Sequence, residues 1–498
     1  MWDAVIIGAG VSGCSVAREL ARYDLKVLVV EKGHDLCAGA TRGNSATVHA
    51  GYDPEPGSNK AIYNVRGSRM YEELCRELDV PYTRNGMIIF AVNEEQMNEV
   101  RRLKATGDAN GVRTEVCDRK RLLEIEPDMG EGVIGGLWIP DSAMVCPYNL
   151  VFAMAENAAR NGIEFRTATE IKEIENRDGL WIVRTAGGEE LETKYVFNCS
   201  GTHSDKFNNM VSRHTFHIIP REGQHLILDR DLSKYAKTTI CQTPEKLPTG
   251  GHTKGMGFMP SVDGTIILGT NADDVDDPDF SDNTREGLDK ILNYFEDKWK
   301  YLPISRHIPR FPKDAVITAY GGTRAHADTN DFILGEPEDA PGFINVAGIE
   351  SPGVTAAPAI AEDMAKILID RLKPRKKADY KPGREVKAPF RTMTKEEREK
   401  AIAEDPDYAK IVCRCEQVTE AEIRDAIRRP VGARSINGVK MRTRAGMGRC
   451  QGGFCSTRVL EILCEELHKT PLEITQSGRG SNILLDRACE RKETADGE

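Results

Sequence analysis

One motif near the N-terminus constrains the fold more than any other part of this 498-residue chain. A short apolar run from Ala4 to Ile7 leads directly into the turn Gly8-Ala9-Gly10-Val11-Ser12-Gly13. An amphipathic stretch follows to about Arg22, and then a second run, Lys26 to Glu31, which ends in an acid. Strand, G-x-G-x-x-G turn, helix, strand and acid in this order are typical of a dinucleotide-binding βαβ unit.

Each glycine of this motif, and the acid that follows it, has a separate physical task. Gly8 permits the tight turn, Gly10 lets a pyrophosphate approach the backbone, and Gly13 lets the helix pack on the strand. The helix N-terminus offers unpaired N–H groups and the positive end of its dipole to the phosphates. Glu31 stands at the end of the second strand, where we expect it to accept hydrogen bonds from ribose hydroxyls.

The residues after the motif favour FAD over NAD. A nicotinamide enzyme usually continues with regular βαβ units, whereas this chain enters a loop rich in glycine, serine and asparagine, residues 39–45, followed by Val48-His49-Ala50-Gly51. Such a loop can place backbone donors along a flavin. No second G-x-G-x-x-G follows a strand, so we predict no independent NAD site.

Composition excludes several other classes. The net charge of -10 and the pI of about 5.7 argue against a general nucleic-acid binder. No apolar run approaches the roughly 18 residues of a spanning helix, and the N-terminus has no basic, signal-like region. We therefore expect a cytoplasmic protein that reaches a membrane only through a partner. The 13 cysteines are odd in number and scattered, which favours reduced thiols or metal ligands over a disulfide framework.

A second cofactor signal lies near the C-terminus. Cys413-Arg414-Cys415 is followed after 34 residues by Cys450-Gln451-Gly452-Gly453-Phe454-Cys455. Four thiolates from two loops can hold a zinc ion or an iron–sulfur cluster. Zinc pairs usually have two to four residues between the cysteines, so the C-x-C pair favours the cluster. The loop at 444–448 can turn backbone N–H groups toward sulfur. The nine other cysteines are interpreted as small buried hydrophobes.

At this point the chain resembles the D-amino-acid-oxidase-like flavoproteins, in the branch of glycerol-3-phosphate and L-2-hydroxyglutarate dehydrogenases. The resemblance spans about residues 1–372 and depends on GAGVSG with Glu31, on GNSATVHAG, VFNCSG, GTR and GIESPGVT. The C-terminal segment is similar to bacterioferritin-associated-ferredoxin-like [2Fe-2S] domains. This pairing of domains resembles the A subunits of anaerobic glycerol-3-phosphate dehydrogenases. In one stretch, Tyr52 to Gly57, the family's phosphate-binding arginine is missing and the chain looks more like the L-2-hydroxyglutarate dehydrogenases.

The resemblance implies an α/β Rossmann-like FAD-binding domain with an inserted, mainly antiparallel α+β substrate domain, plus a small helical C-terminal [2Fe-2S] domain. We place the discontinuous FAD-binding domain at 1–80, 145–215 and 325–372, and the substrate domain at 81–144 and 216–324. A solvated linker is predicted at 373–408, the [2Fe-2S] domain at 409–476 and a polar tail at 477–498. Helices are expected near 60–78, 94–105, 148–161, 283–297, 418–428 and 455–468, and one beginning around Thr355.

The resemblance also implies a set of site residues. His49 is the candidate base, unless it only packs against the flavin, and Arg324 is the candidate clamp for a substrate anion, unless it pairs with a nearby acid. His225 is a weaker candidate, as are His252 and Lys254, whose glycine-rich loop is equally well a plain solvent loop. The cofactor-binding residues are predicted to be Gly8, Gly10, Val11, Ser12, Gly13, Glu31, Lys32, Thr41, Asn44, Ser45, Ile171, Gly201, Gly348, Gly353, Val354 and Thr355. The cluster ligands are predicted to be Cys413, Cys415, Cys450 and Cys455.

The expected function is an FAD-dependent dehydrogenase for a small anionic 2-hydroxy compound, with sn-glycerol 3-phosphate favoured as substrate and dihydroxyacetone phosphate as product. L-2-hydroxyglutarate dehydrogenase and an amine or opine-type oxidoreductase are the alternatives, and a non-catalytic redox subunit is a third. A flavin takes two electrons and a [2Fe-2S] cluster passes one at a time. We therefore expect electrons to leave for a second flavoprotein or an electron-carrier subunit, within an oligomer or hetero-complex.

Overall fold

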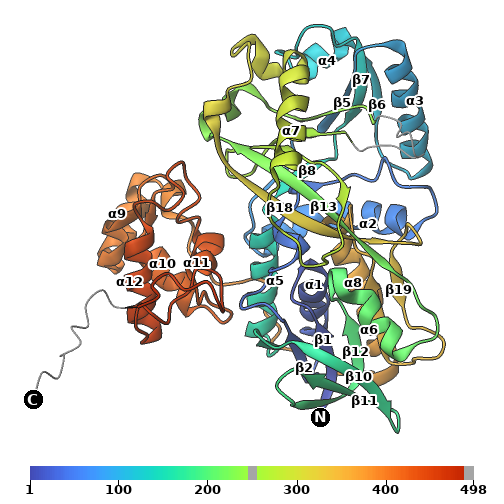
Figure 1. Ribbon diagram of the computed structural model, residues 1–498, viewed down its shortest axis with the longest axis vertical. Helices are drawn as coiled ribbons and strands as arrows, with labels where there is room; N and C mark the ends of the chain where they lie inside the picture. Colours follow the sequence, from blue (N-terminus) through green and yellow to red (C-terminus); the bar gives the residue numbers. More distant parts are fainter. Residues whose placement is uncertain (245–254, 487–498) are drawn as a thin grey trace, which may run out of the picture. The chain divides into compact units, whose positions relative to one another are not determined.

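The computed structural model describes residues 1–244 and 255–486, and its chain divides into two compact units, Met1–Val386 and Lys387–Glu498 (Figure 1). Each unit is described by itself. Among the helices of the described ranges, none is both long and apolar enough to cross a membrane.

The first sheet of the larger unit contains the N-terminal motif. Its parallel strands are ordered β20 (Phe343–Ala347), β12 (Glu190–Asn198), β1 (Trp2–Ile7), β2 (Val27–Val30) and β9 (Glu164–Arg166). The hairpin of β10 (Ile171–Arg177) and β11 (Leu180–Thr185) extends β12 in antiparallel fashion, and β19 (Ile333–Gly335) pairs with β20 in the same way. Parallel strands require long crossover connections, which usually contain a helix.

Helices cover this sheet because each buries one apolar face. α1 (Val11–Leu20) packs against α5 (Pro147–Arg160) and α8 (Gly353–Leu372), and α8 also packs against α2 (Asn59–Glu77) (Figure 1). The Ser58 side chain caps α2 by accepting a hydrogen bond from the Ala61 N–H. The helix starts expected near 60, 148 and 355 lie within two residues of the observed starts of α2, α5 and α8. Val5, Leu28 and Val196 form part of the sheet core.

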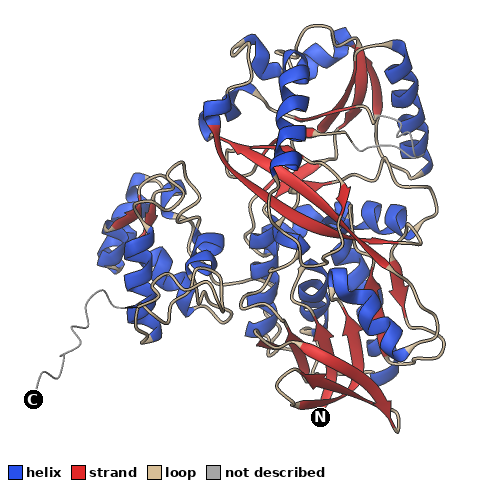
Figure 2. Cartoon of the chain, viewed as in Figure 1, coloured by secondary structure: helices blue, strands red, loops and turns tan. Residues whose placement is uncertain are grey.

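The second sheet of this unit has nine strands. Its order is β17 (Asp273–Asp274), β13 (Ile218–Leu228), β16 (Ile266–Gly269), β15 (Gly257–Pro260), β14 (Thr239–Gln242), β5 (Met87–Ala91), β7 (Gly135–Ile139) and β6 (Glu115–Asp118), with β18 (Val316–Ala327) on the other edge of β13. Of these pairs only β14 with β5 is parallel. The long strands β13 and β18 run from this sheet toward the first one (Figure 2).

Helices α3 (Glu94–Ala109), α4 (Arg119–Ile125) and α7 (Arg285–Lys298) accompany the second sheet. Phe258, Phe295 and Trp299 are almost completely buried in its core. A third, small sheet contains β3 (Thr47–Val48), β8 (Ala143–Val145) and β4 (Tyr82–Thr83). Its strands occur in the sequence where the chain passes from one large sheet to the other. It matters here because β3 leads directly into His49.

The structure differs from the solvated linker expected at 373–408. Asn157 of α5 donates from its amide to the carbonyls of Lys381, Pro382 and Gly383, at 2.7–2.9 Å. The Arg384 guanidinium is buried and pairs with Glu156 at 3.3 Å. Residues up to 386 thus belong to the first unit, and Phe390 is already in a core cluster of the second. Of the eleven basic residues over 373–400, Arg375 and Arg384 pair with Asp24 and Glu156, far away in the sequence, which composition alone does not predict.

The second unit is helical. It contains α9 (Lys395–Glu404), the two-stranded pair β21 (Ile411–Cys413) and β22 (Val418–Thr419), α10 (Glu420–Arg428), α11 (Ile436–Thr443) and α12 (Ser456–Leu467). Ile423, Val439 and Ile462 lie in its core. α10 and α12 match the expected helices, whereas α9 and α11 come from polar and glycine-containing stretches in which sequence periodicity is weak.

Candidate functional site

A cavity of about 1760 Å³ lies in the first unit. Its wall combines the carboxyl end of the first sheet with the faces of β13 and β18, so residues from both sheets contact one space. A pocket at the carboxyl ends of parallel strands is the usual ligand site of such sheets.

The N-terminal motif forms one end of the cavity with the geometry that a dinucleotide needs. Gly8 has φ of +100°, a conformation open mainly to glycine. A side-chain Cβ at Gly13 would overlap the Gly8 carbonyl oxygen, so α1 packs on β1 only because this residue is glycine. The Val11 N–H at the start of α1 donates to Thr41 Oγ1 at 3.1 Å, which fixes residues 40–42 beside the helix N-terminus.

Glu31 lies where the motif predicts an acid. Its carboxylate accepts hydrogen bonds from the Ala9 and Gly33 N–H groups, both at 2.8 Å. Each oxygen keeps a further lone pair for a ligand, and the side chain lines the cavity. Lys32 also lines it, but its ammonium group pairs with Asp279, from the segment before α7.

The structure brings most of the predicted cofactor-binding residues to this cavity. Lining residues include Gly8, Gly10, Val11, Ser12, Glu31, Lys32, Thr41, Asn44, Ser45, Ile171, Gly201, Gly353 and Val354. Gly13, Gly348 and Thr355 are not among the lining residues. Thr355 is fully buried and its hydroxyl accepts a hydrogen bond from the His49 N–H at 3.0 Å. His252 and Lys254 lie outside the described residues.

His49 lines the cavity at the end of a loop that is fixed on both sides. Besides the contact of its N–H with Thr355, its carbonyl accepts a hydrogen bond from Asn64 Nδ2 at 2.5 Å. Asn64 belongs to α2 and is fully buried. Two neighbouring helices therefore hold the backbone that carries the imidazole.

One face of the β13–β18 ladder forms the floor of the cavity. Directly opposite residues on antiparallel strands share a face, and here the pairs are Arg221 with Arg324, Gly223 with Gly322, and His225 with Tyr320. The two glycines leave room for close neighbours, the Arg324 guanidinium over one and the Gly43 backbone over the other. A Cβ at Gly223 would lie 2.5 Å from Arg324 Nη2, and one at Gly322 would overlap the Gly43 carbonyl.

Arg324 presents a cation to the cavity without a carboxylate partner among the described residues. Its guanidinium donates only to neutral oxygens, the Glu222 and Asn271 carbonyls and Thr270 Oγ1, at 3.2–3.4 Å. Burial lowers the pKa of Arg324 from its usual value, although the group stays charged at any accessible pH. The Glu350 and Glu222 carboxylates favour its charge from a distance, but a buried cation without an ion-pair partner is stabilised further by an anionic ligand.

Sequence reasoning missed other charged groups of the wall, and these have partners. Arg221 pairs with Asp274 at 2.6 Å, and Lys60 pairs with Glu350 at 2.6 Å. His326 Nδ1 also contacts the Glu350 carboxylate, at 2.9 Å. The motif GIESPGVT, which contains Glu350, could have pointed to this part of the wall. Nothing in the sequence tells which acid neutralises which base. This contrast makes Arg324 the better candidate for binding an anionic ligand.

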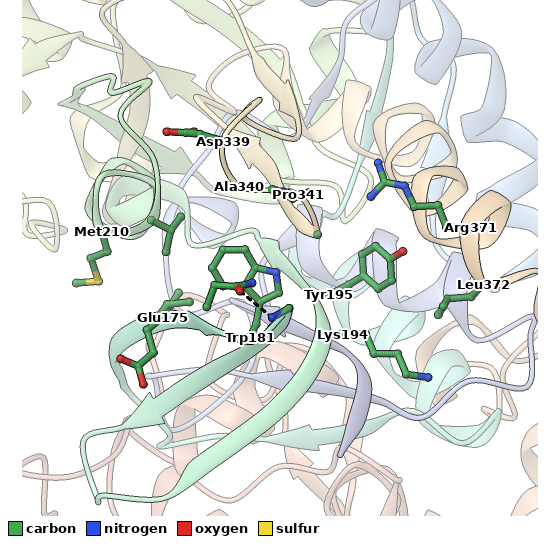
Figure 3. A pocket seen from close by; sticks show the side chains of 15 residues that line it. Glu175, Trp181, Lys194, Tyr195, Met210, Asp339, Ala340, Pro341, Arg371 and Leu372 are labelled. Atoms are coloured by element: carbon green, nitrogen blue, oxygen red, sulfur yellow. Dashed lines mark hydrogen bonds between the residues drawn. The ribbon is translucent and has the colours of Figure 1, made fainter.

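A second hollow of the first unit, of about 660 Å³, lacks this character (Figure 3). Its charged groups already have protein partners: Lys194 pairs with Asp3, Asp339 accepts from Ser212, and Arg371 pairs with Glu336. We therefore regard the larger cavity as the functional one.

The four predicted cluster ligands of the second unit converge as two pairs. Cys415 Sγ lies 3.7 Å from Cys450 Sγ, and Cys413 contacts Cys455. A tetrahedral metal with sulfur bonds of about 2.3 Å places two thiolates about 3.7 Å apart. Among residues 1–244 and 255–486 no group of three or more His, Cys, Asp or Glu side chains is set around a single ion. Two thiol pairs fit the two irons of a [2Fe-2S] cluster better than one zinc.

The surroundings favour negative charge on one sulfur of each pair, Cys413 and Cys450, whereas the pKa values of Cys455 and Cys415 are raised by their paired thiols. A hydrogen bond from the Cys455 thiol lowers the pKa of Cys413 to about 6, with help from the N–H groups of Gly446 and Glu416. Gly446 belongs to the loop at 444–448. Of the described cysteines outside the four, Cys241 and Cys464 are only partly buried and the others are buried.

These features define a flavoprotein oxidoreductase with an iron–sulfur domain. The first sheet is mainly parallel and its first turn is G-x-G-x-x-G, a second sheet shares the cavity with it, and a unit with four converging cysteines follows. Family comparisons agree. Residues 3–367 match the model of FAD-dependent oxidoreductases, and residues 411–465 match the BFD-like [2Fe-2S] binding domain. The chain belongs to the FAD-dependent oxidoreductase family, binds FAD and carries a [2Fe-2S] domain.

Three relatives narrow the class. The chain is 41% identical to a glycerol 3-phosphate dehydrogenase of Caloramator mitchellensis, over 97% of this chain and 98% of that protein. It is 28% identical to the glycerol 3-phosphate oxidase of Mycoplasma pneumoniae, over 74% of this chain and 94% of the relative. The reduced, FAD-bound structure of L-alpha-glycerophosphate oxidase from M. pneumoniae superimposes with a TM-score of 0.70 at 27% identity, covering 78% of this chain and 99% of that one. The mitochondrial L-2-hydroxyglutarate dehydrogenase of Caenorhabditis elegans is 27% identical over 75% of this chain and 94% of its own length.

Proposed function

We propose that the protein oxidises sn-glycerol 3-phosphate to dihydroxyacetone phosphate. The observation that carries this proposal is Arg324, a buried cation that faces the cavity and has only neutral oxygens as partners. A small substrate with an anionic group supplies the charge that the protein leaves out. The 41% identical glycerol 3-phosphate dehydrogenase supports the choice of phosphate.

The cavity residues divide the work in this proposal. The glycine turn, Glu31 and the loop at 39–45 hold FAD, which accepts two electrons as a hydride when bound. Arg324 holds the anionic group of the substrate. His49, on its fixed loop, takes the proton of the reacting hydroxyl, because an imidazole has a pKa near the working pH in its ordinary state.

L-2-hydroxyglutarate remains the second candidate substrate because of Tyr52. This residue lines the cavity in the stretch where the phosphate-binding arginine of the family is missing, and its hydroxyl contacts Met87 Sδ at 3.4 Å. An amine or opine-type substrate would use the same anion clamp without a phosphate.

Electrons leave the flavin through the [2Fe-2S] domain to a protein acceptor, in this proposal a second flavoprotein or an electron-carrier subunit. The exposed Cys415, beside Cys450, provides an edge from which a cluster can exchange single electrons. The complex is cytoplasmic and contacts a membrane only through its partners.

An anaerobic titration of the purified protein, followed by its visible spectrum, tests the substrate. Bleaching of the flavin by sn-glycerol 3-phosphate is the expected result. Bleaching by L-2-hydroxyglutarate alone, or by an amino acid alone, would replace the proposed substrate, and bleaching by none of them would contradict a dehydrogenase of this class.

A further inference from the structure

His225 occupies the floor of the cavity at the centre of β13. Its ring stacks on Tyr320 of β18, with the ring centroids 4.7 Å apart and the planes within 7°. The Tyr320 hydroxyl donates to the Asn44 carbonyl at 2.8 Å. The imidazole is therefore held from one side by a tyrosine that is itself fixed to the loop at 39–45, and only 1% of the residue is exposed.

Neither ring nitrogen of His225 has a hydrogen-bond partner in the part of the chain that the structure describes. Buried polar groups are almost always paired, because an unpaired one loses its water without compensation. Burial, assisted by the nearby charge of Arg324, lowers the pKa of His225 to about 3. The ring is thus neutral at physiological pH and offers one N–H donor and one lone pair.

His225 and Arg324 both line the cavity, so one ligand can contact them together. Gly223 lies two residues before His225 on the same face of β13, and the guanidinium of Arg324, from β18, extends over it. Two residues along a strand span about 7 Å, a length comparable with that of a phosphorylated three-carbon molecule. A Cβ at Gly223 would meet the Arg324 guanidinium and Thr270 Oγ1, so the glycine leaves room for the guanidinium to extend toward His225.

We propose that His225 binds the substrate directly, by hydrogen bonding a hydroxyl that is not oxidised, next to the anionic group held by Arg324. This inference rests on the proposed function and assigns the C1 hydroxyl of sn-glycerol 3-phosphate to His225. A hydroxyl both donates and accepts, which matches a neutral imidazole with one donor and one acceptor. A second anion would require a protonated ring, which burial and Arg324 oppose. For the same reason His225 is a weak acceptor for the proton of the reacting hydroxyl, and that role stays with His49.

The test compares two substrates in the wild type and in one variant. His225→Phe keeps a flat ring on Tyr320 and removes both nitrogens. The second substrate is the matching enantiomer of propane-1,2-diol 1-phosphate, which lacks only the C1 hydroxyl. The rate of anaerobic flavin bleaching gives kcat/KM for each pair. We expect the wild type to favour sn-glycerol 3-phosphate by about tenfold or more, and His225→Phe to lose most of that preference while oxidising the analogue at nearly the wild-type rate.

The chain offers a matched control. His307 is also a histidine stacked on a tyrosine, Tyr235, at 4.6 Å between centroids, but it does not line the cavity. His307→Phe should leave the preference between the two substrates unchanged. His225→Gln, which restores one donor and one acceptor, should recover part of the preference, and flavin absorbance reports how much folded holoprotein each sample contains.

The possible outcomes distinguish a failure of this inference from a failure of the proposed function. An equal loss on both substrates in His225→Phe would assign His225 a structural role and overturn the inference alone. The absence of any preference in the wild type would overturn it as well. A wild type that sn-glycerol 3-phosphate does not bleach would contradict the proposed function, whatever the variants do.

Discussion

The cavity of the first unit is walled by residues from position 7 to position 354, whereas the four cysteines of the second unit come from two short segments, 413–415 and 450–455. The cavity keeps away from water a cation without an ion-pair partner and an imidazole without a hydrogen-bond partner among the described residues. At the cysteine pairs, Cys413 is buried but Cys415 and Phe454 reach the surface. A two-electron reaction on a small molecule needs enclosure, while one-electron exchange with another protein needs an exposed edge. The two sites should therefore respond differently to substitution.

The largest expected effect is the loss of the cluster in Cys413→Ala. Removing one of four thiolates should abolish the visible absorbance and the paramagnetic signal of the reduced cluster. Flavin content and its bleaching by substrate should persist, because the residues that line the FAD cavity belong to the first unit. Cys464→Ala, which changes a partly buried cysteine of α12 outside the four, is the control. Simultaneous loss of flavin would break the comparison.

Next in size is Arg324→Met. Loss of a buried charge-assisted contact to the substrate anion should lower kcat/KM by roughly a thousandfold, about 4 kcal/mol. Stopped-flow bleaching of the flavin measures this loss. Arg177→Met, at an exposed ion pair of β10, should change the rate by less than about twofold. A similarly small effect for Arg324→Met would mean that no anion binds there.

His225 should also make stability depend on pH. The unfolded histidine takes up a proton near pH 6.5, but the folded one does so only near pH 3. The unfolded state binds more protons between these values, so the contribution is intact above pH 6.5 and falls by about 2 to 3 kcal/mol between pH 6.5 and 4.5. Urea unfolding at both pH values should therefore show a steeper loss for the wild type than for His225→Phe. Parallel curves would indicate that the ring is protonated or solvated in the folded protein.

The smallest effect belongs to Phe454→Ser, beside the cluster ligands. Phe454 is 87% exposed, so its removal should change the free energy of unfolding by no more than about 0.5 kcal/mol and should leave the cluster absorbance intact. A destabilisation of several kcal/mol in thermal or urea unfolding would show that the ring is covered, and would weaken the contrast between an enclosed and an open site.

The contrast also explains what the sequence can and cannot predict. Gly8, Gly13 and Glu31 act through backbone geometry over a few residues, and the cysteine pairs act through local spacing, so both signals are legible in one sequence. His225 is different, because its importance comes from contacts that it lacks. Its two ring nitrogens lose their partners only once β13, β16 and β18 have folded around it. The packing of residues 376–384 on α5 was equally invisible, since it depends on Asn157 and Glu156, more than 200 residues away.

The contact between Gly43 and Gly322 has a consequence for inheritance. A Cβ on Gly322 would overlap the Gly43 carbonyl, and one on Gly43 would lie 2.6 Å from the Gly322 Cα, so each position is blocked by backbone and not by a movable side chain. Neither glycine can be replaced alone without a clash between the new Cβ and the opposite backbone. Replacing both only adds a second clash. Although 279 residues apart, the two positions are held to glycine by one and the same backbone contact. Mutational libraries that aim to alter the substrate should vary the floor around this pair and leave both glycines untouched.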